Sequence, residues 1–126
     1  IYVRDVMHTG HDMPLVATGS QLTTALEEMS TKGLGMTGII NSEGQLIGIY
    51  TDGDVRRSIN RCIDVKTAVI DQVMVSNPRS TTADSLAAEV VQLMRQHSIN
   101  GLFAVDSEQR PIGALNALDL MRAGIF

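Results

Sequence analysis

Two places in the sequence combine a small polar side chain with an aspartate three residues later. Thr51 precedes Asp54 and Asn116 precedes Asp119, and in both places an apolar run comes before and an amphipathic segment after. This pattern is typical of a helix N-cap, in which the side-chain oxygen accepts a first-turn amide and the helix dipole favours the aspartate. The same geometry suits a nucleotide, because free amides at a helix start receive phosphate and a carboxylate accepts both hydroxyls of a ribose. The pattern by itself favours a helix cap, whereas its repetition in the second half favours a ligand site. Both hypotheses stay open.

Three arginines follow the first of these aspartates. Arg56, Arg57 and Arg61 come after Asp52 and Asp54, so acidic residues begin the predicted helix and basic residues end it. This order complements the helix dipole and needs no ligand. The alternative is that Arg56 or Arg57 neutralises the phosphate of a ligand, or an acidic partner.

Two further patterns look like known sites but favour structural roles. Gly33–Gly38 spells G-x-G-x-x-G, yet it follows a predicted helix and precedes a predicted strand, which reverses the order of the dinucleotide-binding fingerprint. His8 and His11 lie near Asp5 and Asp12, but no thiolate is close and a structural zinc ion usually has four protein ligands. We therefore expect a solvent-exposed loop there and no metal site.

No group of residues indicates catalysis. The single cysteine, Cys62, falls on an apolar stripe without a histidine nearby in the sequence, so we do not expect a nucleophile. No Ser-His-Asp, Walker or paired-carboxylate pattern stands out. We expect no catalytic residue in this chain and no required cofactor.

The composition is that of a small folded protein. With 126 residues, 44% of them apolar and 19% charged, the chain is long enough for one compact domain or two very small ones. The formal net charge of −4 argues against a broad nucleic-acid surface, and no apolar run is long enough to span a membrane. One cysteine permits no internal disulfide, which fits the cytoplasm. Because the sequence begins at Ile1 rather than Met, we expect it to be part of a longer protein.

An internal repeat organises the chain. The segment Ile47–Arg57 aligns with Ile112–Arg122 at an offset of 65 residues (112 − 47), and Met7 aligns with Met74 at an offset of 67 (74 − 7). Two halves of about 60 residues are each marginal alone, because so small a domain buries too little of its surface. We therefore expect two pseudo-symmetric units that bury a shared face.

Each half, 1–63 and 64–126, is predicted to contain strand, helix, strand, strand and helix in that order, a mixed α/β (α+β) fold. Apolar residues at helical spacing predict the first helix of each half, and two short apolar runs around a polar turn predict a hairpin. Ser20 in the first half, and Thr82 or Asp84 in the second, are candidate helix caps. The predicted elements are short strands at Leu15–Thr18 and around Ser80, first helices over Leu22–Met29 and Leu86–Met94, hairpins over Met36–Tyr50 and Leu102–Leu115, and closing helices over Val55–Ile63 and Leu118–Ile125.

The repeat resembles the CBS domain pair. In that family a Gly-x-x-Thr-x-x-Asp motif runs from the last strand into the last helix of each unit; Gly48–Asp54 matches it fully, and Gly113–Asp119 matches it with Asn in place of Thr. Three further runs are similar to the C-terminal CBS pair of bacterial arabinose-5-phosphate isomerases: Val3–Gly10, Thr51–Arg57 and Asp119–Ile125. Those enzymes feed synthesis of the lipopolysaccharide sugar Kdo, and their catalytic sugar-isomerase domain lies upstream and is absent from this chain.

The resemblance implies a regulatory, ligand-sensing pair of CBS units that binds a nucleotide in a cleft between the units. Carried over residue by residue, Asp54 would hold the ribose hydroxyls and Thr51 a phosphate or ribose oxygen. A second cleft would centre on Asn116 and Asp119, where Asn in place of Thr weakens the phosphate site. The base and the opposite wall would be bordered by Ile49, Gly35, Met36, Thr37, Thr9, Met13 and Pro14.

The resemblance also implies ligands and partners. The ligand would be AMP, ATP or the cytidine nucleotide sugar CMP-Kdo. The partners would be the upstream isomerase domain and a second CBS pair, in a disc-like dimer; neither nucleic acid nor a membrane is expected, and the expected location is the cytoplasm. The rival hypothesis is a structural dimerisation module whose clefts bind no ligand.

Overall fold

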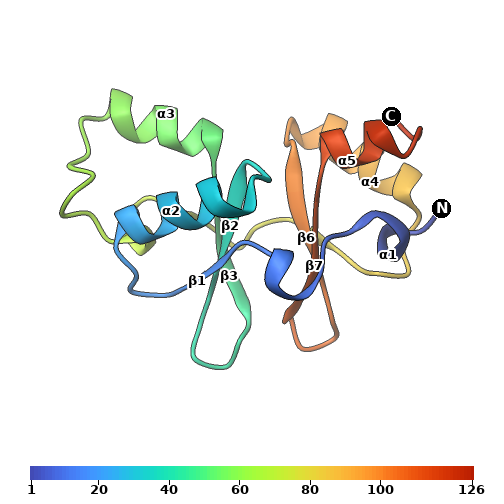
Figure 1. Cartoon of the computed structure of the whole chain (residues 1–126), viewed down its shortest axis with the longest axis horizontal. Coiled ribbons are helices and arrows are strands. Elements are labelled where there is room, and N and C mark those ends of the chain that lie inside the picture. Colours follow the sequence, from blue (N-terminus) through green and yellow to red (C-terminus); the bar gives the residue numbers. More distant parts are fainter. The chain divides into compact units, whose positions relative to one another are not determined.

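The computed structural model describes all residues 1–126 and divides the chain into two compact units (Figure 1). The middle unit consists of residues 14–78, and the terminal unit consists of residues 1–13 together with 79–126. The two units therefore do not have the boundaries of the halves 1–63 and 64–126, which describe the repeat in the sequence. No helix of the structure is both long enough and apolar enough to cross a membrane.

The middle unit is a four-stranded sheet with helices packed on it. The strand order is β1-β2-β3-β4; β1 runs parallel to β2, and the other neighbours are antiparallel. Helix α2 packs on β1 and β2, and helix α3 packs on β3. Its elements are β1 (Leu15–Ala17), α2 (Leu22–Lys32), β2 (Met36–Ile40), β3 (Leu46–Thr51), α3 (Asp52–Asn60), a 3-10 turn η2 (Ile70–Gln72) and β4 (Val75–Ser76).

The terminal unit repeats this plan with a three-stranded sheet. The strand order is β5-β6-β7, with β5 parallel to β6 and β7 antiparallel to it. Helices α4 and α5 pack on each other, and the short helix α1 packs on α4. Its elements are α1 (Val3–Val6), a 3-10 turn η1 (Gly10–Asp12), β5 (Ser80–Thr81), α4 (Ala87–His97), β6 (Gly101–Val105), β7 (Pro111–Asn116) and α5 (Ala117–Arg122). The predicted order of strands and helices is confirmed in both halves.

The two repeats exchange the segments that lead into them. In the middle unit Val75 of β4 pairs with Ile49 of β3, and in the terminal unit His8 forms the corresponding bridge with Ala114 of β7. Val75 comes from the second half of the sequence and His8 from the first. Each compact unit is thus completed by the lead-in segment of the other repeat.

The exchanged segments also start the first helix of each unit, where we expected polar caps. The N-cap residues are Gln21 and Leu86, and neither makes a side-chain cap hydrogen bond, so the prediction of caps at Ser20 and at Thr82 or Asp84 is wrong. The physical reason lies in the exchanged backbone. The amide of Leu22 donates to the carbonyl of Ala68 at 2.9 Å, and the amide of Ala87 donates to the carbonyl of Ile1 at 2.9 Å, so first-turn amides are satisfied without a side chain.

The closing helix of the middle unit ends earlier than predicted. Helix α3 stops at Asn60, and Cys62 follows in a left-handed conformation with φ of 60°. The amide of Ile63 then donates to the carbonyl of Ser58. Cys62 is therefore exposed rather than part of an apolar stripe.

Each lead-in segment places a methionine on a glycine of the last strand. Met74 packs on Gly48 in the middle unit, and Met7 packs on Gly113 in the terminal unit. A Cβ at either glycine would overlap the thioether sulfur of its methionine. The glycines are therefore required for close approach, because a protein interior has no spare volume there.

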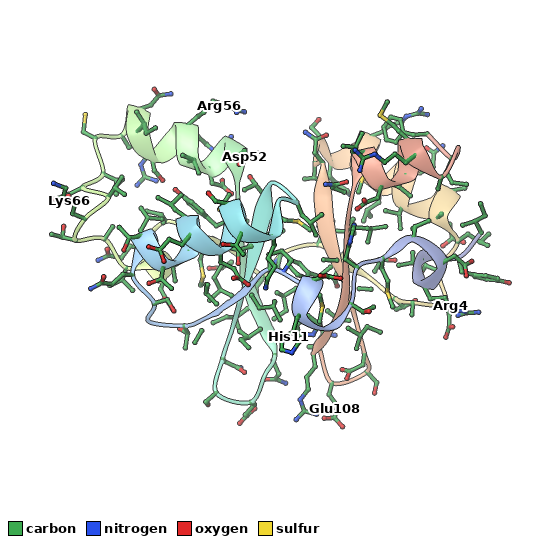
Figure 2. All side chains as sticks on the ribbon, in the orientation of Figure 1. Arg4, His11, Asp52, Arg56, Lys66 and Glu108 are labelled. Carbon is green, nitrogen blue, oxygen red and sulfur yellow. The ribbon has the colours of Figure 1, made fainter.

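A polar contact holds each lead-in segment at its outer end. In the middle unit Asp71 accepts hydrogen bonds from the Thr18 hydroxyl and, at 2.7 Å, from the Gly19 amide. In the terminal unit the equivalent positions carry Arg4 and Asp84, which form an ion pair; Arg4 lies on α1 (Figure 2). The repeat therefore keeps the contact while changing its chemistry.

The variant Gly113→Ala should destabilise the protein by about 1–3 kcal/mol, the usual cost of forcing extra volume into a packed site. The added methyl would meet the sulfur, Cγ and Cβ of Met7. Urea unfolding measures the loss, and the double variant Met7→Ala/Gly113→Ala is the control, because shortening Met7 makes room for the methyl. If the double variant loses as much unfolding free energy as the two single variants together, Met7 and Gly113 are not coupled and this contact is contradicted.

The variant Asp71→Asn should remove a pH-dependent part of the stability. The hydrogen bond from the Thr18 hydroxyl, which has the largest effect, and that from the Gly19 amide lower the pKa of Asp71 in the folded protein. Because the pKa is lower in the folded than in the unfolded protein, the ionised carboxylate stabilises the fold at every pH above the unfolded pKa. This stabilisation is lost as the pH falls through the pKa of the folded protein. The gap in unfolding free energy between wild type and Asp71→Asn should therefore be widest near neutral pH and close below about pH 4. The role of Asp71 would be refuted if the difference in unfolding free energy were the same near neutral pH and below about pH 4. It would also be refuted if the exposed control Glu27→Gln showed an equal pH-dependent difference.

Candidate functional site

The junction between β3 and α3 holds the first predicted site. Thr51 is the N-cap of α3, and its hydroxyl accepts from the amide of Asp54 at 3.4 Å. In return the amide and the hydroxyl of Thr51 donate to Oδ2 of Asp54 at 2.9 and 3.1 Å. The other carboxylate oxygen, Oδ1, accepts from Nε and Nη2 of Arg57 at 3.3 and 2.8 Å. The capping interpretation is confirmed here.

The carboxylate of Asp54 is fully occupied by these contacts. A carboxylate offers about four lone-pair positions, and four N–H or O–H donors reach Asp54. The residue is only 6% exposed, whereas the side chain of Arg57 is 66% exposed. A further donor could bind Asp54 only by displacing one of these four, and those of the exposed Arg57 side chain are not part of the helix cap.

The junction between β7 and α5 holds the second predicted site and has the same local geometry. The amide of Asn116 donates to Oδ2 of Asp119 at 2.9 Å, and the amide of Asp119 donates to Oδ1 of Asn116 at 2.9 Å. The second neighbour of the carboxylate differs, because Oδ1 of Asp119 lies 2.9 Å from Nε2 of His8 rather than beside an arginine. The cap is confirmed at this junction as well.

His8 is the residue that sequence reasoning placed wrongly. We expected a solvent-exposed loop around it, but its amide and carbonyl exchange hydrogen bonds with Ala114 at 2.8 and 2.9 Å, and its ring contacts Asp119. The signal was present in the repeat: at the offset of 67, His8 corresponds to Val75, which lies in β4. The pairing of Val75 with Ile49 in one half therefore corresponds to the bridge between His8 and Ala114 in the other.

Strand pairing brings several other predicted residues beside Thr51. Met36 pairs with Thr51, Thr37 with Tyr50, and Gly38 with Ile49. Gly35 has a φ of 76° and its carbonyl accepts from the amide of Asp52 at 3.1 Å, so the turn after α2 lies against the start of α3. The side chains of Met36 and Thr37 are fully buried. The carbonyl of Pro14 accepts from Gly38 at 2.9 Å, so Pro14 also belongs to the middle unit.

The remaining predicted residues are not all joined to this group. Thr9 and Met13 flank η1 in the terminal unit, so their role as the wall opposite Thr51 stays a prediction. Arg56 is exposed and is not paired with an acidic residue. No cluster of three histidine, cysteine, aspartate or glutamate side chains is arranged to hold a metal ion.

Comparisons with known proteins extend these observations. The family model of the CBS domain matches residues 3–61 and 70–125. The chain is 50% identical over 124 residues to the arabinose 5-phosphate isomerase KdsD of Pseudomonas aeruginosa, covering 98% of this chain and 38% of that protein. It is 37% identical over 123 residues to the KdsD of Escherichia coli K12, covering 37% of that protein. The chain thus spans less than two fifths of the length of these relatives.

Solved structures share the fold at low sequence identity. The CBS domain pair of protein MJ0100, solved in complex with 5'-methylthioadenosine and S-adenosyl-L-methionine, has a TM-score of 0.85 at 21% identity and covers 98% of this chain and 99% of its own. CBSX2 in complex with AMP has a TM-score of 0.84 at 22% identity and covers 98% of this chain and 96% of its own. With two matched segments, two capped strand-to-helix junctions and this fold, the chain belongs to the CBS domain family as a pair of CBS domains.

Proposed function

We propose that this CBS pair is the regulatory, ligand-sensing region of an arabinose 5-phosphate isomerase and binds a nucleotide at the start of α3. The observation that carries the proposal is the carboxylate of Asp54, buried at a helix start and paired with the exposed, cationic Arg57. The 50% sequence identity to KdsD over 124 residues supports the assignment to that enzyme. The ligand would be AMP, ATP or CMP-Kdo.

The parent protein follows from the same comparison. Because the chain covers 38% of its Pseudomonas relative, the rest of such a protein would carry the sugar-isomerase domain, upstream in the same polypeptide. The proposed setting is cytoplasmic synthesis of Kdo for lipopolysaccharide, with CBS pairs joining into a homo-oligomer. No catalytic role is assigned to this chain itself.

The two junctions should differ in what they bind. At α3, Thr51 offers a hydroxyl, and Gly53 leaves room for the guanidinium of Arg57, which a Cβ there would meet at 3.0 Å. At α5, Asn116 and Leu118 occupy the corresponding positions, and the second residue adds bulk where a phosphate would approach. We therefore assign the nucleotide to the junction containing Asp54.

A ligand-free dimerisation module is the second candidate. Helix α5 exposes Leu118 and Met121 to 46% and 58%, and Phe126 after it to 48%. Apolar side chains gathered on one short helix are typical of a contact surface. Thermal melting with AMP, ATP and CMP-Kdo separates the two functions, because a ligand that binds only the native state must raise the midpoint. No rise with any of the three would favour the structural module.

The variant Asp54→Ala should lose the recognition of a ribose diol. Wild type should bind AMP more tightly than 2'-deoxy-AMP, which lacks the 2'-hydroxyl donor, because a hydrogen bond to a charged group typically contributes about 1.5–3 kcal/mol, or roughly ten- to a hundredfold in affinity. In Asp54→Ala the two nucleotides should bind equally. Calorimetric titration measures both, with circular dichroism to confirm folding, since the cap is also lost. Asp119→Ala is the matched control and should keep the preference; equal losses in the two variants would refute the choice of junction.

The variant Arg57→Met should change the balance between nucleotide and nucleoside. In the ligand-free protein Arg57 holds Asp54, and a ribose that takes its place frees the guanidinium to pair with the phosphate. Arg57→Met should therefore bind adenosine at least as well as wild type and lower the ratio of AMP to adenosine affinity by about two- to fivefold. Arg61→Met, on the same helix end, is the control. An unchanged ratio in Arg57→Met would show that Arg57 does not reach the phosphate.

A further inference from the structure

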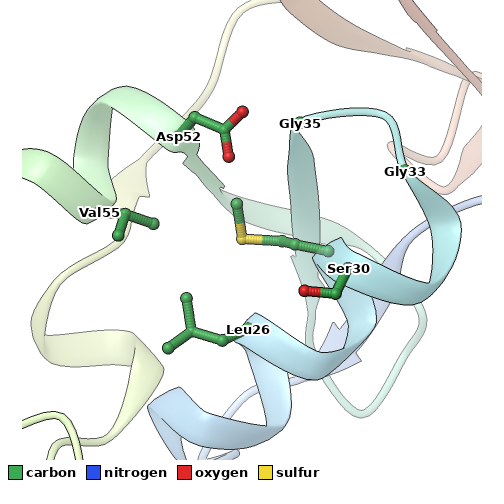
Figure 3. Close-up of a pocket in the computed structure, with 7 residues that line it drawn as sticks. Leu26, Ser30, Gly33, Gly35, Asp52 and Val55 are labelled. Carbon is green, nitrogen blue, oxygen red and sulfur yellow. The ribbon is translucent and has the colours of Figure 1, made fainter.

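We infer that the middle unit carries a second binding site, for a small aliphatic ammonium or guanidinium ion, in a pocket between α2 and α3. The pocket has a volume of ≈ 390 Å³, within the range typical of small-molecule sites. Figure 3 shows side chains from both helices around the same open space. Its lining comes from α2, the turn after it and the start of α3: Leu26, Met29, Ser30, Gly33, Gly35, Asp52 and Val55.

The lining combines apolar walls with one carboxylate. Leu26, Met29 and Val55 supply the walls, and Asp52 lies at the upper edge in Figure 3. A Cβ at residue 35 would sit 3.1 Å from Oδ2 of Asp52, so Gly35 makes room for the carboxylate.

The dipole of α3 stabilises the charge of Asp52 in its first turn, but Asp52 has no ion-pair partner. Asp54, two residues later, is paired with Arg57, whereas no basic side chain forms an ion pair with Asp52. Arg56 lies one helical turn further along α3 and does not pair with it (Figure 2). The pocket also adjoins the C-terminal turn of α2, where the helix dipole favours positive charge. An aliphatic arm ending in a cation therefore fits both the walls and the charge.

The terminal unit shows that this pocket does not come with the fold. At the offset of 65, Asp52 corresponds to Ala117 and Val55 to Leu120, which is completely buried and packs in one cluster with Met94 of α4. The corresponding helices of that unit close on each other. Three other pocket positions carry larger side chains there, with Arg95 for Ser30, Ser98 for Gly33 and Asn100 for Gly35, whereas Met94 corresponds to Met29 and the smaller Val91 to Leu26. The opening is thus produced by residues particular to the middle unit.

This site differs from the proposed nucleotide site. It uses neither Thr51 nor Asp54, and it shares only Gly35 with the residues predicted to border the nucleotide. The two proposals can therefore be tested independently: the protein can bind a nucleotide without binding an amine, or an amine without a nucleotide.

The test is a titration of the ¹⁵N-labelled chain with butylammonium and butylguanidinium, followed by amide chemical shifts. Both should move the amides of Gly33, Gly35 and Asp52 with saturation, whereas butyrate and butanol of the same length should not. Asp52→Asn should weaken cation binding by about two- to fivefold, the range for an exposed ion pair. Glu27→Gln, which removes an exposed carboxylate of α2 outside the pocket, should leave it unchanged.

A second variant closes the pocket with residues of the terminal unit. Asp52→Ala/Val55→Leu should abolish the cation-induced shifts while the thermal midpoint stays at or above that of wild type, because the leucine fills space between the helices. Equal binding of butyrate or butanol, shifts confined to amides elsewhere, or unchanged cation affinity in Asp52→Asn would overturn the inference.

Discussion

The docking of a lead-in segment from one repeat onto the last strand of the other is the contact on which the rest of the structure depends. Met7 packs on Gly113 and Met74 on Gly48, at positions where no other residue than glycine leaves room. The same segments complete the sheets and supply the carbonyls that start α2 and α4. Each unit of roughly 60 residues thus gains core and hydrogen bonds that its own repeat does not provide.

The exchange also determines the electrostatics of the two capped junctions. Asp54 and Asp119 are held by equivalent local bonds, yet the Arg57 side chain beside Asp54 comes from its own helix, whereas the His8 ring beside Asp119 comes from a segment 111 residues away. The guanidinium of Arg57 donates two hydrogen bonds to Asp54, whereas a single ring nitrogen of His8 contacts Asp119. A duplicated motif has therefore acquired two different environments without any change in its backbone.

The middle unit carries both proposed binding features, and for related reasons. Gly35 lets the turn after α2 approach the start of α3 and leaves space for Asp52, while Gly53 leaves room for the guanidinium of Arg57. In the terminal unit Asn100 and Leu118 stand at these positions, and α4 and α5 close on each other. Glycines at these two positions thus leave room for the polar side chains of Asp52 and Arg57 in the middle unit, whereas larger residues stand there in the terminal unit.

The sequence by itself determined the features that depend on neighbouring residues. The order of strands and helices follows from apolar spacing, and the caps at Thr51 and Asn116 follow from a pattern three residues long, because their hydrogen bonds close within one helical turn. The tertiary structure alone decided which lead-in segment joins which unit, and with it the contact between His8 and Asp119 and the backbone partners of α2 and α4. The physical reason is that a repeat has the same periodicity whether its halves keep or exchange these segments. Only the packing of residues far apart in the chain distinguishes the two arrangements.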